Sequence, residues 1–273
     1  MNKKAIKKIV ERFPSLASFY RNTRDWLDQR RPPVGTKWGF SFAGHEAMAG
    51  GNFEPAETEV MRKLMSDLDV LVNIGANIGY YCCHALSMGK PVIAVEPNNL
   101  NLHYLLKNIQ NNGWSNLAEV FPLAMGRGAD ILQMWGGGTG ASLVKGWAGI
   151  DEGFVTQVPV MSLDRILGDG LKGKKALILV DIEGAEYMML QGATKTLISE
   201  PRPVWMVEIS TTEHQPAGVI INPHFAKTFQ MFFSQGYRAF TADEEAIEIT
   251  LDTVNRIVTG AQLPRTNNFL FKT

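Results

Sequence analysis

Only two cysteines occur in the sequence of 273 residues, and they are neighbours, Cys82 and Cys83. Adjacent cysteines rarely bridge each other and their spacing does not suit zinc, so we expect no disulfide framework and a reducing compartment. No apolar run is long enough for a membrane span, and the N-terminus lacks the apolar core of a signal peptide. We therefore expect a cytoplasmic protein.

An excess of either charge is also missing, since lysine plus arginine and aspartate plus glutamate each number 27. No overall field therefore points to nucleic acid as a partner. Residues 1–31 are the exception, because nine basic residues there stand against three acidic ones and apolar residues recur at helical spacing. A basic amphipathic helix can contact anionic lipid as a peripheral membrane segment, or it can pack its apolar stripe on the domain, which we favour.

After a linker-like segment that ends at residue 35, apolar runs alternate with segments of helical periodicity. The predicted strands are 69–75, 91–97, 118–125, 129–135, 176–183, 203–210, 237–240, 246–251 and 267–272. The predicted helices are 77–88, 99–111, 185–199 and 224–235, with a glycine-dense loop over 136–144. Short apolar strands between helices favour a mainly parallel α/β sheet with helices on both faces. We predict a basic helical extension and linker over residues 1–35 and one domain over 36–273.

The segment V-N-I-G-A-N-I-G-Y-Y (72–81) places two glycines four apart, where a strand ends and a helix begins. Glycine allows the tight turn and lets a ligand approach backbone N–H groups. A P-loop needs Lys-Ser/Thr after its last glycine, and a dinucleotide fingerprint needs a glycine where Asn77 stands. The looser loop of S-adenosylmethionine (SAM) enzymes remains.

Glu96 ends the second predicted strand, in A-V-E-P-N. A carboxylate at such a position can accept hydrogen bonds from both hydroxyls of a ribose, and a charged acceptor binds them more strongly than a neutral one. NAD sites use the same contact, so Glu96 alone does not distinguish the cofactors. A solvated carboxylate at a strand end is the alternative without a function.

Six segments together resemble the successive motifs of the FkbM-like SAM-dependent methyltransferases, in the family's order and over roughly residues 36–240. They are N-I-G-A-N-I-G-Y-Y, V-I-A-V-E-P-N, L-L-K-N-I-Q-N-N-G, V-P-V-M-S-L-D, L-V-D-I-E-G-A-E and V-E-I. The resemblance implies a class I methyltransferase (Rossmann-like) fold, whose mainly parallel seven-stranded sheet has an antiparallel last strand. It also implies methylation of a hydroxyl on a sugar, glycan or other secondary metabolite. Asn73 departs from the family, which usually has Asp there, and predicts weaker cofactor binding or compensation by Glu57 or Asp181.

The predicted SAM contacts lie in the glycine loop and at the ends of the neighbouring strands. They are Asn73, Gly75, Ala76, Asn77, Gly79, Tyr80, Glu96, Pro97, Asn98, Ala124 and Asp181.

Methylation of an alcohol calls for a base, and the acids at the ends of two later strands are candidates. Asp181 and Glu183 end the strand 176–183, where alternation places them on the same side, and Glu208 ends the next strand. His214, in the following loop, is a further candidate base. The acids could instead cap the next helix or hold a divalent cation, but we predict no metal site.

Two functions of other classes stay open. The fold could be a non-catalytic scaffold for SAM or for a protein partner, which Asn73 favours. It could also be a nicotinamide enzyme, which the missing middle glycine argues against. The acceptor depends on loops 136–156 and 211–223, whose composition fits many hydroxylated small molecules or glycans, and the sequence predicts no oligomeric state.

Overall fold

The computed structural model of the protein describes residues 32–150 and 153–273. The predicted basic helix and its membrane contact, residues 1–31, lie outside the described residues. The end of the predicted linker forms a short strand, β1 (Val34–Gly35), which pairs with β2 (Ser41–Phe42). Within the described residues, no helix combines the length and the apolar character needed to cross a membrane.

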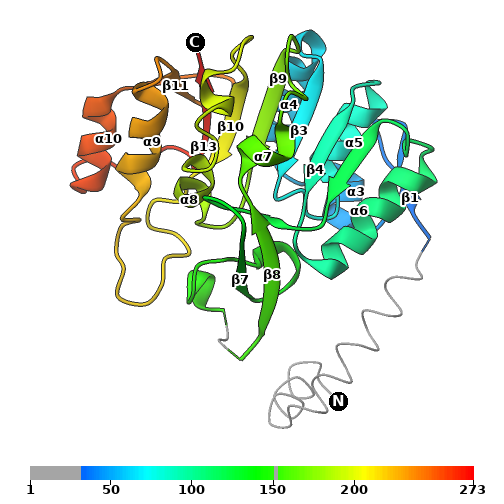
Figure 1. The fold of residues 1–273 in the computed structure, drawn as a ribbon, viewed down its shortest axis with the longest axis horizontal. Helices are drawn as coiled ribbons and strands as arrows, with labels where there is room; N and C mark the ends of the chain where they lie inside the picture. Colours follow the sequence, from blue (N-terminus) through cyan, green and yellow to red (C-terminus); the bar gives the residue numbers. More distant parts are fainter. Residues whose placement is uncertain (1–31, 151–152) are drawn as a thin grey trace.

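One sheet of eight strands forms the centre of the domain (Figure 1). Its spatial order is β12 (Glu248–Ile249), β11 (Arg238–Thr241), β13 (Asn268–Lys272), β10 (Val204–Glu208), β9 (Ala176–Val180), β3 (Val70–Ile74), β4 (Val92–Val95) and β5 (Ala118–Phe121). The five strands from β10 to β5 are parallel, whereas β13 runs antiparallel to both of its neighbours. The predicted class I arrangement is confirmed, with the two-residue β12 as an eighth strand.

Helices cover both faces of this sheet, as predicted. The face of Leu177 and Leu179 packs against α4 (Pro55–Asp67), α5 (Tyr80–Ser87) and α6 (Asn99–Asn111). The alternate residues Ile178 and Val180 face α7 (Leu163–Leu167), α8 (Glu186–Leu190), α9 (Phe225–Phe233) and α10 (Leu251–Val258). Strands that are apolar on both sides are therefore buried on both sides. The short α3 (Glu46–Gly50) precedes α4.

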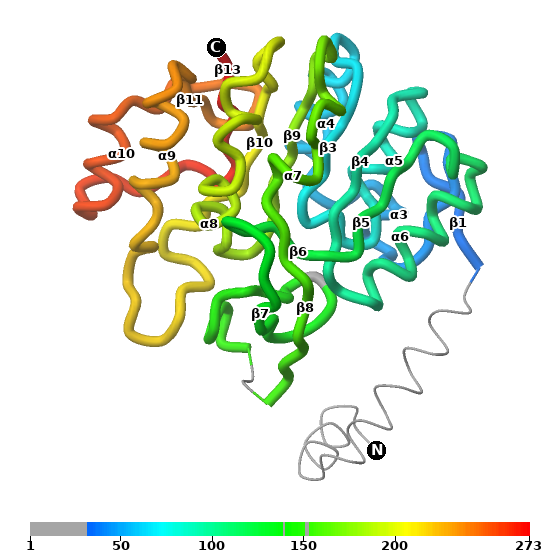
Figure 2. The backbone as a smooth tube through the Cα atoms, viewed as in Figure 1, coloured from blue at the N-terminus to red at the C-terminus, as the bar shows by residue number. Residues whose placement is uncertain are grey.

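A second sheet of three strands lies beside the carboxyl ends of the central strands (Figure 2). It contains β6 (Ala124–Met125), β8 (Val155–Met161) and β7 (Asp130–Trp135), in that spatial order. The predicted strand 118–125 is thus two strands in two sheets, and they are separated at Pro122, which has no N–H for a ladder. Residues 136–150, between β7 and β8, include two 3₁₀ turns, η1 (Gly138–Gly140) and η2 (Trp147–Gly149), and are called the strap below.

Three predictions of element boundaries are wrong. The predicted helix 185–199 ends after five residues, because Gly192 packs on the backbone of Gly126, where a Cβ would collide with the carbonyl oxygen; the turn η3 (Thr196–Ile198) follows. The strand 176–183 ends at Val180. The hairpin arm predicted near 246–251 is only the two-residue β12, because Thr250 caps α10 with a capping box and the helix begins at Leu251.

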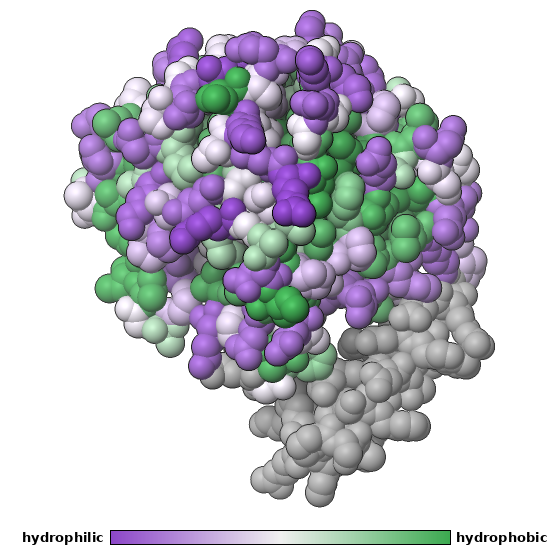
Figure 3. All heavy atoms as spheres, viewed as in Figure 1, coloured by the Kyte–Doolittle hydropathy of each residue, from purple (hydrophilic) through white to green (hydrophobic). Residues whose placement is uncertain are grey.

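On the face shown in Figure 3, hydrophobic residues reach the surface in several groups separated by hydrophilic ones. Ile131 of β7, Ile220 and Leu263 are among the large apolar side chains exposed. Scattered exposure of this kind is normal for a globular domain.

Candidate active site

The loop after β3 uses its own N–H groups inside the protein. The N–H groups of Gly75 and Ala76 both donate to the carbonyl of Val95 at 2.9 Å, and Gly79 N–H donates to Ala76 at 2.8 Å. Asn77 N–H donates to a carboxylate oxygen of Glu96 at 2.8 Å. Such a loop has few N–H donors left for an anion at these positions.

The two glycines serve close packing of the chain on itself. Gly75 has a φ of +81°, and a Cβ on it would collide with the backbone carbonyl of Asp181. Gly79 has a φ of +88°, and its Cβ would lie 2.7 Å from the Leu105 side chain on α6. The glycines therefore bring β3, β9 and α6 together around the loop.

Glu96 is buried at the end of β4 and serves as the acceptor around which the loop is arranged. One oxygen accepts from Asn77 N–H, and the other accepts from Asn98 N–H at 2.7 Å and from Asn101 Nδ2 at 3.3 Å. A carboxylate has about four acceptor positions, so one remains open. Burial raises the pKa of Glu96 to about 7, against the opposite effect of these hydrogen bonds.

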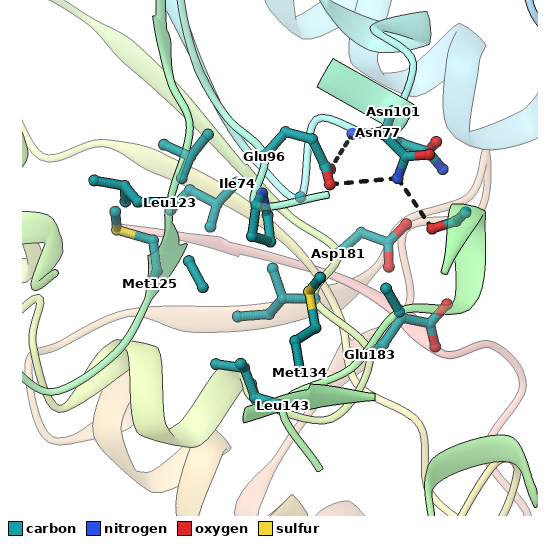
Figure 4. A pocket seen from close by; sticks show the side chains of 18 residues that line it. Ile74, Asn77, Glu96, Asn101, Leu123, Met125, Met134, Leu143, Asp181 and Glu183 are labelled. Carbon is teal, nitrogen blue, oxygen red and sulfur yellow. Dashed lines mark hydrogen bonds between the residues drawn. The ribbon is translucent and has the colours of Figure 1, made fainter. Parts of the chain in front are cut away.

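A cavity opens between this loop, the end of β9 and the small sheet (Figure 4). Its polar side holds Glu96, Asn101, Asp181 and Glu183. Its other walls are apolar and are built by Ile74, Val95, Leu123, Ala124, Met125, Met134, Ala141 and Leu143. A mostly apolar cavity with a few convergent polar groups is typical of a small-molecule site.

A second, smaller cavity lies beyond Asp181 and is lined by Glu54, Tyr81, Glu208 and Asn268 among others. The Tyr81 hydroxyl donates to Glu54 at 2.6 Å. Burial, and then the neighbouring Glu208, raise the pKa of Asp181 well above its ordinary value. Burial, and then Glu183, raise the pKa of Glu208 to about 7. Asp181 and Glu208 share a hydrogen bond, so this pair retains a proton near neutral pH.

Glu183 is held differently. The indole N–H of Trp147, on the strap, donates to Glu183 Oε2 at 2.6 Å, and Nδ1 of His214 lies 3.9 Å from the same oxygen. Glu183 has a φ of +53°, so its backbone is in the left-handed region at the edge of the cavity. Strand alternation does not place Asp181 and Glu183, because β9 ends before Asp181.

Left-handed residues other than glycine gather around these cavities. Glu54, Asn77, Ala148, Glu183 and His214 all have positive φ, and the sixth such residue in the described chain, Ala246, lies elsewhere. Each such conformation costs on the order of 1–3 kcal/mol and persists only where the surroundings enforce it. This clustering supports a functional role for the region.

Half of the predicted site residues line the larger cavity: Gly75, Asn77, Glu96, Pro97, Ala124, Asp181 and Glu183. Glu208 lines only the smaller one, and half of the His214 side chain is exposed beside Glu183.

The remaining predicted residues lie beneath or beside the cavity. Asn98 caps α6, its side chain accepting from Leu100 and Asn101 N–H. The Tyr80 hydroxyl donates to Phe53 O at 3.2 Å, and Ala76 and Gly79 pack the loop.

Asn73 is buried under the loop, where its oxygen accepts from the Cys82 thiol at 3.4 Å. Among the described residues its Nδ2 is one of three buried polar side-chain atoms without a hydrogen-bond partner. Glu57, one of the acids expected to compensate, accepts instead from Asn268 at 3.4 Å. The departure at position 73 therefore leaves an unpaired amide below the site.

Sequence reasoning missed Asn101, Trp147, Glu54 and Tyr81. Asn101 Nδ2 donates to both Glu96 and the carbonyl of Gly138, at 3.3 and 3.0 Å, and so links the acid to the strap. Its place one helical turn after Asn98 was the only signal in the sequence. Within residues 32–150 and 153–273, no three His, Cys, Asp or Glu side chains converge as metal ligands.

A family model of the methyltransferase FkbM domain matches residues 73–239, more than half of the chain. A search of curated proteins gives no match. The match spans the glycine loop, Glu96, both acidic strand ends and the strap, and it ends in β11.

Three solved structures have a similar fold. A methyltransferase FkbM from Methylobacillus flagellatus KT is 19% identical with a TM-score of 0.45; the match covers 75% of this chain but only 43% of that protein. An O-methyltransferase from Bacillus cereus, in complex with SAH, is 10% identical with a TM-score of 0.44, covering 79% and 78% of the two chains. A precorrin-6y C5,15-methyltransferase from Geobacter metallireducens GS-15 is 11% identical with a TM-score of 0.38, covering 84% and 91%. Such values say nothing about a substrate.

Proposed function

Since the chain belongs to the methyltransferase FkbM domain family, we propose that it uses SAM to methylate a hydroxyl of a sugar, glycan or other secondary metabolite. The observation that carries this proposal is the cavity between the glycine loop and the strap. Its polar side holds the acceptor Glu96 and the carboxylate Glu183. A cofactor and an acceptor can thus meet at the ends of β3, β4 and β9.

The residues present fit SAM better than a nucleotide with phosphates. The loop donors are used internally, so there is no evident cradle for a pyrophosphate, which argues against NAD. Glu96 retains an acceptor position for a ribose hydroxyl, and the apolar wall of Leu123, Met125 and Leu143 suits an adenine ring. No lysine or arginine is among the described residues that line the two cavities, and this suits a ligand with positive charges.

When bound, SAM supplies a methyl group, carried on a sulfonium, that can be transferred to an oxygen nucleophile. The chain must place the acceptor hydroxyl in line with that group and remove its proton. Asp181 is poorly suited to remove it, because the Asp181–Glu208 pair holds a proton near neutral pH. Glu183, at the edge of the cavity and in contact with Trp147, is the base we propose.

Calorimetric titration with SAM and with NAD tests the cofactor. We expect SAM to bind and NAD not to bind. Glu96→Gln should weaken SAM binding, whereas Glu119→Gln, an exposed acid on β5, should leave it unchanged. Absence of SAM binding by the wild type would refute the proposal.

Methyl transfer is tested with tritium-labelled SAM and a panel of neutral oligosaccharides and glycosides. We expect label in at least one of these acceptors. SAM binding without transfer to any hydroxyl would instead favour the non-catalytic scaffold, which the unpaired amide of Asn73 makes the second candidate.

A further inference from the structure

Trp147 is a buried aromatic residue near the end of the strap, with 3% of its surface exposed. Its indole N–H donates to Glu183 Oε2 at 2.6 Å. The ring lies against Gly184, where any Cβ would press into it, so the residue after Glu183 is kept small. The contact is short and has a charged acceptor, which makes it stronger than a hydrogen bond between neutral groups.

Two further contacts fix the strap to the same place. The Ser142 hydroxyl donates to the backbone carbonyl of Glu183 at 2.5 Å, and Ala148 N–H donates to the backbone carbonyl of His214 at 2.7 Å. Ala148, Glu183 and His214 have φ values of +51°, +53° and +63°. The strap, which is itself left-handed at Ala148, thus contacts two left-handed residues, Glu183 and His214. It holds the Glu183 carboxylate between the cavity and His214.

Building on the function proposed above, we infer that Trp147 is a positioning residue. It fixes the Glu183 carboxylate so that Glu183 takes the proton of the acceptor hydroxyl and His214 passes that proton to solvent. The geometry supports each part of this assignment. Glu183 lines the cavity, Nδ1 of His214 is 3.9 Å from its carboxylate, and 51% of the His214 side chain is exposed to water.

The proton is accounted for at each stage. The O–H bond of the acceptor breaks while its oxygen forms a bond to the methyl carbon and the C–S bond breaks, leaving its electrons on sulfur. The proton goes to the Glu183 carboxylate, then to Nδ1 of His214, and the imidazolium returns a proton to water. A gap of 3.9 Å is too long for a direct hydrogen bond, so a bridging water or a rotation of the exposed imidazole completes the path.

The contact is tested without any acceptor by the indole N–H resonances of the six tryptophans, with Trp147→Phe giving the assignment. We expect the Trp147 proton far downfield in the wild type, because its bond is short and charged. In Glu183→Gln, which keeps an acceptor oxygen but loses the charge, it should move toward the others. An unmoved resonance would show that Trp147 does not hold the carboxylate, whatever the activity.

The catalytic consequence is tested with labelled SAM and the panel acceptor that the wild type methylates fastest. Glu183→Gln should lower kcat by about 10²–10⁴-fold. Trp147→Phe should lower it by about 10–100-fold, as expected for the loss of one hydrogen bond to a charged group, with SAM affinity unchanged. Trp114→Phe, the same change away from the cavity, is the control.

The double variant separates positioning from a merely structural role. If Trp147 acts through Glu183, then Trp147→Phe plus Glu183→Gln is no slower than Glu183→Gln alone. Multiplied losses would overturn the inference, and so would wild-type kcat in Trp147→Phe. Wild-type kcat in His214→Gln would remove His214 from the proton path. If the wild type methylates no acceptor, the proposed function fails, while the indole resonance still decides whether Trp147 holds Glu183.

Discussion

The affinity for the cofactor should depend on pH through Glu96. Its pKa is raised to about 7 by burial, so the carboxyl is mostly protonated below that pH and mostly ionised above it. A neutral carboxyl is a weaker acceptor for a ribose hydroxyl than a carboxylate. Affinity should therefore rise as the pH rises from 6 to 8.

The size of the effect follows from the same contacts. Roughly a tenth of the molecules have an ionised Glu96 at pH 6 and roughly nine tenths at pH 8, so affinity should rise up to about tenfold if only the carboxylate binds ribose. Three of about four acceptor positions are already used, so one new hydrogen bond is expected. Glu96→Gln should then weaken binding by about 1.5–3 kcal/mol at pH 8, the contribution of one charged bond.

The assay is calorimetric titration at several pH values with SAM and with 5′-methylthioadenosine, which carries the ribose but neither the sulfonium nor the ammonium group. Because 5′-methylthioadenosine has no positive charge, electrostatic attraction to Asp181, Glu183 and Glu208 does not contribute to its pH profile. We expect a rise with pH for both ligands in the wild type and in Glu119→Gln, and a flat profile for 5′-methylthioadenosine in Glu96→Gln. An equal slope in Glu96→Gln would refute the assignment of ribose to Glu96.

Three further predictions follow from the contacts of the site. Gly75→Ala should lower the melting temperature far more than Gly89→Ala, because both glycines have positive φ but only the Cβ at Gly75 would meet another part of the chain, the Asp181 carbonyl. Urea unfolding should show the ligand-free protein losing stability as the pH rises from about 4.5 to 7, because the folded state holds protons on Glu96 and Glu208 that the unfolded state has released. Glu96 alone contributes at most about 3 kcal/mol to this loss of stability, and its contribution should be absent in Glu96→Gln, where that of Glu208 remains. Asp181→Asn should keep most of the methyl transfer that Glu183→Gln loses, since Asp181 already shares a proton with Glu208; equal losses in the two variants would contradict this.

The sheet could be predicted from the sequence because its strands are buried on both faces. The apolar runs that end at Ile74, Val95 and Val180 have few other stable environments, and the helix 99–111 has the predicted boundaries. Boundaries failed where a contact between distant residues ends an element. The helix predicted to reach residue 199 stops because Gly192 packs on Gly126, a contact that no local pattern reports.

The candidate site likewise has one part that the sequence predicts and another that it does not. Residues that follow a strand directly, such as Gly75, Glu96 and Asp181, could be placed from the order of the elements. The side of the site formed by the strap could not be placed from the order of the elements. The bond between Trp147 and Glu183 joins residues 36 apart in the chain, and both the strap and the loop after β9 need left-handed residues other than glycine to form it.

The two acids that follow β9 have different surroundings. Asp181 is the first residue after β9, where a pattern of strand ends places a catalytic group, yet its surroundings are buried and already hold Glu208 as a partner. Glu183 lies two residues further, in a left-handed turn, and its carboxylate accepts a hydrogen bond from a side chain on the strap. Two carboxyl groups of one motif thereby have different hydrogen-bond partners. Asp181 has a second acid as its partner, whereas Glu183 accepts from an indole N–H, and this difference is why we propose Glu183 rather than Asp181 as the base.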